Sequence, residues 1–241
     1  MKIAFYTAIY GDYDILKPPI NKESKNQIDY FIFKDNEVKI DGFKSLVLSK
    51  FTNKSNSWKA RYAKLNAHKY LLEYDYLVWF DGSFQIDEKE ILNLIRDNQN
   101  VDLFLFKHPT RNCAYKEIAA CYLSFKESTI KLFLQNLLYR IRGFRKDSGL
   151  YATGIFIRKY STQTNVFFEE WFKHVHYLSK RDQISLPFVL EKHKLKLLVL
   201  SKNIYDSSLG YFYKHSKSIY STNKGFFRRA YFKVKLLLKG T

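Results

Sequence analysis

Residues 76–83 read YLVWFDGS, five apolar residues followed directly by an aspartate and a glycine. The apolar run, 76–80, is rich in aromatic side chains and predicts a short buried strand. Asp81-Gly82 ends this strand with a dipeptide that is typical of turns. The stretch therefore predicts a central strand with a carboxylate at its end.

Further strand-like segments, and helix-like segments between them, lie on either side of this strand in the sequence. Apolar runs of strand length lie at 2–9, 28–33, 45–48, 103–106, 151–158 and 195–200. Helical spacing of apolar residues marks 58–74, with Asn56 and Ser57 as N-caps, and also 88–97, 115–125, 128–142, 166–178 and 183–192. Strands that alternate with helices predict an α/β fold with a mostly parallel sheet flanked by helices on both faces.

The composition of the 241 residues limits the classes of protein to consider. With 46% hydrophobic and 27% charged residues, the chain has enough apolar surface for one packed domain. The 41 Lys and Arg exceed the 23 Asp and Glu by 18, and this charge predicts an anionic partner such as a nucleotide, a nucleic acid or an acidic membrane. Two cysteines are too few for a disulfide framework, so we expect a reduced, cytoplasmic setting.

The chain divides by charge near its end. Residues 211–241 contain eight Lys and Arg and no acidic residue. One helical face collects the apolar residues Phe226, Phe227, Ala230, Tyr231, Val234, Leu237 and Leu238. We expect a domain at 1–210 and a basic amphipathic helical tail at 211–241. The tail would lie on an anionic membrane or pack on the domain with its basic face in water.

Polar residues follow several of the predicted strands, at the end where open α/β sheets bind their ligands. They are Thr7, Tyr10 and Asp14 around the first strand, with Gly11 among them, Asp35 after the second, Asp81 and Ser83 after the central strand, and His108 and Arg111 after the next. Carboxylates in such places can hold a divalent cation or a ribose hydroxyl. The sequence therefore predicts a ligand site at this edge of the sheet.

Four segments resemble successive motifs of a glycosyltransferase-like family. They are YTAIYGDYD at 6–14, WFDGS at 79–83, HPTRNCAYKE at 108–117 and RDQISLPFVL at 181–190. The family includes plant cell-wall and mucilage proteins and bacterial polysaccharide-cluster proteins. The resemblance implies a GT-A-like, Rossmann-like fold and a nucleoside-diphosphate sugar donor, with a UDP-sugar favoured, usually held with Mn²⁺ or Mg²⁺.

In GT-A enzymes an Asp-x-Asp at a strand end binds the metal and the diphosphate. Here the motif is Asp81-Gly82-Ser83, with one carboxylate, so Ser83 would hold at most a water of the ion. His215 matches a late histidine that often supplies another metal ligand. The alternatives are a turn role for Asp81, an inactive scaffold that has lost a metal ligand, and an ordinary histidine in a basic, tyrosine-rich stretch.

The resemblance also assigns the donor-binding residues. Asp14 and Asp35 are candidates for the nucleoside end, with the backbone of Thr7, Ala8 and Tyr10 lining the base. Arg61 and Lys64 would reach the phosphates, although ordinary solvated helix charges explain them almost as well.

The last group of candidates would contact the sugar. Arg111 and Glu117 suit sugar hydroxyls, or they form a simple salt bridge. Asp182 and Gln183 resemble an Asp-Gln pair beside the donor sugar of retaining enzymes. Asp182 could also be the base of an inverting enzyme or the N-cap of the helix that follows, so the stereochemistry stays open.

Taken together, these residues predict a glycosyltransferase that acts at the cytosolic face of a membrane. It would move a sugar to a surface-polysaccharide or lipid-linked glycan acceptor, and the tail would hold it on the anionic surface. The alternative is a non-catalytic basic module that binds nucleic acid or an anionic membrane. No nucleic-acid motif occurs in the sequence, so we expect no nucleic-acid partner.

Overall fold

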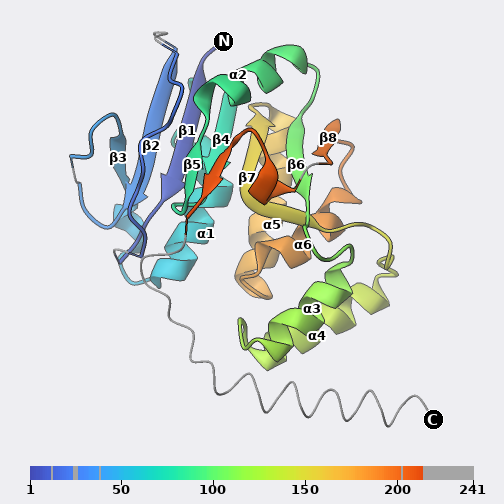
Figure 1. Ribbon diagram of the computed structural model, residues 1–241. Coiled ribbons are helices and arrows are strands. Elements are labelled where there is room, and N and C mark those ends of the chain that lie inside the picture. The colour runs from blue at the N-terminus through green and yellow to red at the C-terminus, as the bar shows by residue number, and fades with distance from the viewer. Residues whose placement is uncertain (12, 24–26, 38, 202, 214–241) are drawn as a thin grey trace.

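A single seven-stranded sheet organises the protein. The computed structural model describes residues 1–241 except 12, 24–26, 38, 202 and 214–241. The strand order is β3-β2-β1-β4-β7-β6-β8 (Figure 1). The strands are β1 (Ile3–Ala8), β2 (Ile28–Lys34), β3 (Lys44–Val47), β4 (Tyr76–Phe80), β6 (Leu103–Lys107), β7 (Tyr151–Lys159) and β8 (Leu197–Leu200). Only β7 runs against its two neighbours in this sheet, so the predicted mostly parallel α/β sheet is confirmed.

Helices cover both faces of the sheet, as the sequence predicts. They are α1 (Asn56–Asn66), α2 (Glu88–Asp97), α3 (Ala114–Leu123), α4 (Thr129–Ile141), α5 (Thr162–Tyr177) and α6 (Asp182–Leu190), with short 3₁₀ turns at Ser49–Phe51, Ala67–Lys69 and Ile204–Asp206. Alternation along β4 separates two cores, because Leu77 and Trp79 pack with residues of α1, α5 and α6, whereas Val78 and Phe80 pack with residues of α2. Among the described residues, no helix is long and apolar enough to cross a membrane.

The first helix differs from its predicted extent. Ser55, rather than Asn56 or Ser57, is the N-cap, and its side chain accepts a hydrogen bond of 3.3 Å from the amide of Trp58. The helix ends at Asn66 and continues as a 3₁₀ turn to Lys69, so the predicted helix 58–74 is too long. The apolar pattern misleads here because Leu72 is exposed and adds nothing to a buried face.

A small second sheet, not predicted from the sequence, joins β5 (Phe84–Ile86) to β9 (Gly210–Phe212). It needs a glycine, because a Cβ at residue 210 would lie 2.1 Å from the carbonyl oxygen of Gln85. β9 runs across the predicted boundary after residue 210. The rest of the predicted tail, with His215 and the apolar face 226–238, lies outside the described residues.

Candidate active site

The ends of the parallel strands and the helix α1 bring charged residues to one edge of the sheet. Asp81 directly follows β4, and Asp35 directly follows β2. Lys59, Arg61 and Lys64 come from α1, which is tied to β1 by a hydrogen bond of 2.8 Å from the Tyr6 hydroxyl to the Lys64 carbonyl. The sheet therefore collects basic and acidic groups where such folds bind ligands.

Lys64 links two of the predicted aspartates. Its Nζ atom lies 2.6 Å from Oδ2 of Asp182 and 3.7 Å from Oδ1 of Asp81. The side chains of Lys64 and Asp182 are almost fully buried, whereas that of Asp81 is 39% exposed. Arg61 lies at 3.9 Å from the other oxygen of Asp182. We call Arg61, Lys64, Asp81 and Asp182 the central charge group.

Asp182 is held in this group from several sides. It is the first residue of α6, and Thr153 on β7 donates a hydrogen bond of 3.1 Å to its Oδ2 atom. The N-cap of α6 is Arg181, so the cap role considered for Asp182 is wrong. The carboxylate instead accepts from Lys64, Thr153 and the amide of Gln183. An acidic residue in the first turn also suits the helix dipole.

The electrostatics of the group fix the charge of Asp182. Burial opposes its ionisation, but Lys64 and Arg61 outweigh burial and hold the pKa of the carboxyl well below its usual range. Asp182 is therefore ionised throughout the neutral range. A carboxylate with so low a pKa is a poor proton acceptor, which argues against a general-base role.

Asp81 is a turn residue and also an accessible carboxylate. Its backbone closes the turn, because its carbonyl accepts from the amide of Phe84 at 2.8 Å, and its Oδ1 atom accepts from Nε1 of Trp79 at 3.1 Å. Asp14 lies across the turn, since a Cβ placed at Gly82 would be 3.3 Å from its Cβ atom. The turn role thus leaves the carboxylate of Asp81 accessible to a ligand.

Asp35 belongs to a second group beside the first two strands. It forms an ion pair with Lys59 and accepts a hydrogen bond of 3.2 Å from the amide of Gly11. Lys59 lies 4.8 Å from the ring centre of Tyr10. A cavity of about 210 Å³ opens here, lined by Tyr10, Lys34, Asp35, Val47, Leu48, Thr52 and Lys59. Its ring and carboxylate are groups that can contact a nucleoside.

Three other predicted donor-binding residues, Thr7, Ala8 and Ser83, are less accessible. Thr7 is fully buried, and alternation along β1 puts its side chain on the α2 face, opposite to Lys64. The amide of Ile9 donates to the carbonyl of Phe33 at 3.0 Å, so the backbone beside Ala8 continues the sheet. Ser83 is buried, and its carbonyl accepts from the amide of Tyr213 at 2.7 Å. Donor roles for Thr7, Ala8 and Ser83 stay predictions.

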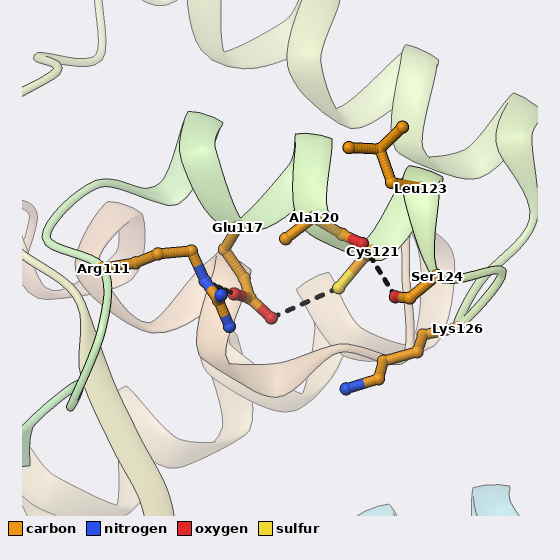
Figure 2. Close-up of a pocket in the computed structure, with 7 residues that line it drawn as sticks. All are labelled: Arg111, Glu117, Ala120, Cys121, Leu123, Ser124 and Lys126. Carbon is orange, nitrogen blue, oxygen red and sulfur yellow. Dashed lines mark hydrogen bonds and ion pairs between the residues drawn. The ribbon is translucent and has the colours of Figure 1, made fainter. Parts of the chain in front are cut away.

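A third group surrounds Glu117 on α3. The buried carboxylate accepts from Nε of Arg111 at 2.5 Å and from the thiol of Cys121 at 3.2 Å, and Arg181 lies 3.8 Å away. Figure 2 shows the side chains of Arg111, Glu117 and Cys121 beside a cavity of about 300 Å³. Its lining residues are Arg111, Glu117, Ala120, Cys121, Leu123, Ser124 and Lys126. The expected Arg111–Glu117 salt bridge is thus present and forms one wall of a cavity.

Titration of this third group is limited by burial. Burial raises the pKa of the Cys121 thiol to about 11, so this cysteine is protonated at neutral pH. Burial and then Arg111 lower the pKa of His108, whose Nδ1 atom accepts from the amide of Arg111 at 3.1 Å. Both side chains are therefore neutral, and the group offers hydrogen bonds rather than a nucleophile.

Residues 181–183 connect the central charge group to the third group, around Glu117. The side chain of Asp182 enters the central charge group, while that of Arg181 turns toward Glu117. Gln183 accepts a hydrogen bond of 3.4 Å from Arg181. The Arg-Asp-Gln motif thus connects both groups at the start of α6.

The described residues do not complete a metal centre. They contain no group of three or more His, Cys, Asp and Glu side chains that could hold an ion. Asp81 and Asp14 supply carboxylates on either side of Gly82, and His215 lies outside the described part of the chain. A metal ion at Asp81 would therefore need ligands beyond the described side chains.

The predicted site residues did not include Lys59, Cys121, Thr153 and Arg181, which all take part in these groups. A signal for Lys59 was present, since 51–72 contains five Lys and Arg and no acidic residue. A helix that carries only cations toward a strand end is a candidate anion site. Thr153 had no comparable signal, because its role depends on the antiparallel placement of β7 beside β4.

The fold and these groups define an α/β domain whose charged side chains gather at the ligand-binding edge of the sheet. The family model described as "TOD1/MUCI70, glycosyltransferase-like domain" matches residues 1–209, and the chain belongs to this family. The family resemblance predicted from the four motifs is thereby confirmed.

Two further comparisons add little beyond the family. No curated protein matches the sequence. Among solved structures, "Crystal structure of S. aureus TarS 1-349" is similar with a TM-score of 0.44 and 12% sequence identity. The match covers 88% of this chain and 60% of that one, so the chain spans less than two thirds of that structure.

Proposed function

We propose that the protein is a glycosyltransferase that uses a nucleoside-diphosphate sugar, a UDP-sugar by preference. The single observation that carries this proposal is the central charge group. A buried ammonium group stands between Asp182 and the exposed Asp81 at the end of the middle strand, in a chain of a glycosyltransferase-like family. The acceptor would be a surface polysaccharide or a lipid-linked glycan, met at the cytosolic side of a membrane.

In this proposal the donor lies along the carboxyl edge of the sheet. The nucleoside occupies the cavity beside Tyr10, Asp35 and Lys59, and the diphosphate approaches Arg61 and Lys64. Transfer breaks the bond from the anomeric carbon of the sugar to the diphosphate and forms a bond from that carbon to an acceptor hydroxyl oxygen. The diphosphate leaves with added negative charge, and the hydroxyl proton passes to the leaving phosphate or to water. A fixed cation in a site shielded from water stabilises that charge more strongly than one in bulk solvent.

Asp182 then has a positioning role. Its ionised carboxylate holds the side chain of Lys64 in place before the donor binds. This differs from a base that takes the acceptor proton, for which its pKa is too low. The neighbouring Gln183 and the Arg111–Glu117 pair are candidates for contacts to the sugars.

We also propose Asp81 as a ligand of Mn²⁺ or Mg²⁺, with His215 as a further ligand. An ion held there would offset charge on the leaving diphosphate. The accessible carboxylate of Asp81 supports this part, and a nucleotide titration with and without Mn²⁺ tests it.

A thermal-unfolding screen of nucleoside diphosphates and their sugars tests the whole proposal. A ligand present at 100 times its Kd should stabilise the fold by about 2.7 kcal/mol. We expect one nucleotide class to raise the melting temperature, and the matching sugar nucleotide to be consumed when an acceptor is present. Binding without any transfer or hydrolysis would favour a non-catalytic module, and no stabilisation by any of them would contradict the donor site.

A further inference from the structure

The helix α4 exposes an apolar stripe that nothing in the described structure covers. Its exposed large residues are Ile130, Phe133, Leu134, Leu137 and Ile141, with 44% to 73% of each accessible to solvent. The helix lies beside α3 at the lower end of the view, below α6 (Figure 1). Five neighbouring side chains of this kind form a patch typical of an interaction surface.

The stripe is a regular feature of the helix. At 3.6 residues per turn its five positions fall within an arc of about 100°. The opposite face holds Leu132, Gln135 and Tyr139, which are buried, and Tyr139 stacks on Phe188 with ring centres 4.2 Å apart. The helix is thus docked on the domain through one face, and the apolar stripe points away from it.

Positive charge surrounds the stripe. Lys131 and Arg140 project on opposite flanks of it at this helical spacing. The segment 126–146 contains six Lys and Arg, and Glu127 is its one acidic residue. An apolar stripe with cations on both sides is the pattern of a helix that lies in the interface of an anionic bilayer.

We propose that α4 docks the protein on a membrane that contains anionic lipids, with this stripe inserted among the lipid headgroups. Charge distinguishes this membrane from the two other possible partners of the stripe, a second copy of the protein and residues 211–241 of the same chain. A second copy would bring two positive segments together, and residues 211–241 of the same chain carry eight Lys and Arg and no acidic residue. An anionic lipid surface is the occupant whose charge complements the segment.

The position of the helix adds a consequence for the site. Leu123, Ser124 and Lys126, just before α4, line the cavity beside Glu117. Docking through α4 would hold this cavity near the bilayer, where a lipid-linked acceptor is presented. The docking itself does not depend on the proposed transferase activity, because vesicle binding is measured without donor or acceptor.

The first test measures binding of the full chain to vesicles of phosphatidylcholine with and without phosphatidylglycerol. The variant Phe133→Gln/Leu137→Gln is compared with the matched control Leu72→Gln/Tyr177→Gln, which changes exposed side chains outside α4. We expect the α4 variant to bind anionic vesicles about tenfold more weakly or worse, and the control to bind like the parent. Equal binding of the two variants would overturn the proposal.

The second test reports insertion directly. The chain has three tryptophans of its own, so each emission spectrum is taken as the difference from that of the parent. In this difference spectrum Phe133→Trp should shift to the blue and be quenched by brominated lipids only when anionic vesicles are added, whereas Leu72→Trp should not respond. A blue-shifted Phe133→Trp without vesicles in a monomeric chain would show that the chain covers its own stripe. Self-association that Phe133→Gln/Leu137→Gln abolishes would show that a second copy covers it. Either result would overturn the membrane proposal.

Discussion

At the scale of single residues, Lys64 has the most demanding position, because its ammonium group is buried against one carboxylate and near a second. Removal of one partner of such a pair costs about 3–5 kcal/mol, since the other charge remains buried. We therefore expect Lys64→Met and Asp182→Asn each to lower the free energy of unfolding by about this amount. The double variant should recover most of it, and urea denaturation of all four proteins measures the coupling. Additive losses would show that the pair is not coupled.

The same pair makes stability depend on pH. The folded pKa of Asp182 lies below its unfolded value, so its contribution is complete above about pH 4 and is lost as the pH falls through the folded pKa. The free energy of unfolding of the parent should fall more steeply on acidification than that of Lys64→Met/Asp182→Asn. Urea denaturation at a series of pH values between neutral and strongly acidic checks this. Parallel curves would mean that Asp182 does not have a lowered pKa.

Asp81 should behave differently from its buried neighbours. Its carboxylate is 39% exposed, so Asp81→Asn should change the free energy of unfolding by no more than about 0.5 kcal/mol. Nucleotide binding and any effect of Mn²⁺ on it should fall in the same variant. Calorimetric titration measures both, with Asp147→Asn, an exposed aspartate remote in sequence, as the control. Unchanged affinity with and without Mn²⁺ would remove Asp81 from the donor site.

At the scale of the elements, α1 carries the basic residues Lys59, Arg61 and Lys64 to the site. Ser55 caps the helix, so Ser55→Ala should cost about 1 kcal/mol of stability, whereas Ser57→Ala, inside the first turn, should cost much less. Thermal unfolding of the two variants distinguishes them. Equal losses would argue against Ser55 as the cap.

The elements also show what the sequence could predict. The strands of the main sheet were recognisable because each is an apolar run, and the helices because their apolar residues recur at helical spacing. β5 and β9 have three residues each, too few for a periodic pattern, and they pair across more than 120 intervening residues. The strand order was likewise not predicted, since it depends on contacts between distant segments.

The site was predictable as a set of residues but not as an arrangement. Asp81 and Asp182 were named from motifs and Lys64 as a basic residue of the preceding helix, yet their contact joins α1, the end of β4 and the start of α6. Lys59 was missed because the basic, acid-free stretch 51–72 marks the helix as a whole and does not single out this lysine. The cap role considered for Asp182 was wrong, because Arg181 is the N-cap and a buried lysine binds the Asp182 carboxylate.

At the scale of the whole molecule, the net charge of +18 has two separate uses in this account. Buried or partly buried cations on α1 face the ligand edge of the sheet, and exposed cations flank the apolar stripe of α4. Salt screens exposed charges much more than buried ones. We therefore expect added salt to weaken vesicle binding far more than nucleotide binding, as vesicle flotation and calorimetric titration at several salt concentrations will show. Equal salt sensitivity would mean that vesicles and nucleotides both bind through solvent-exposed cations.

The most direct test of the central claim uses the folded double variant Lys64→Met/Asp182→Asn. Its Kd is measured calorimetrically for the nucleoside diphosphate that stabilises the parent most. We expect a stable protein whose affinity is at least about tenfold weaker, because the buried cation proposed to face the diphosphate is gone while the fold is kept. A parent-like Kd in this variant would contradict the claim that Lys64 and the central charge group hold the donor.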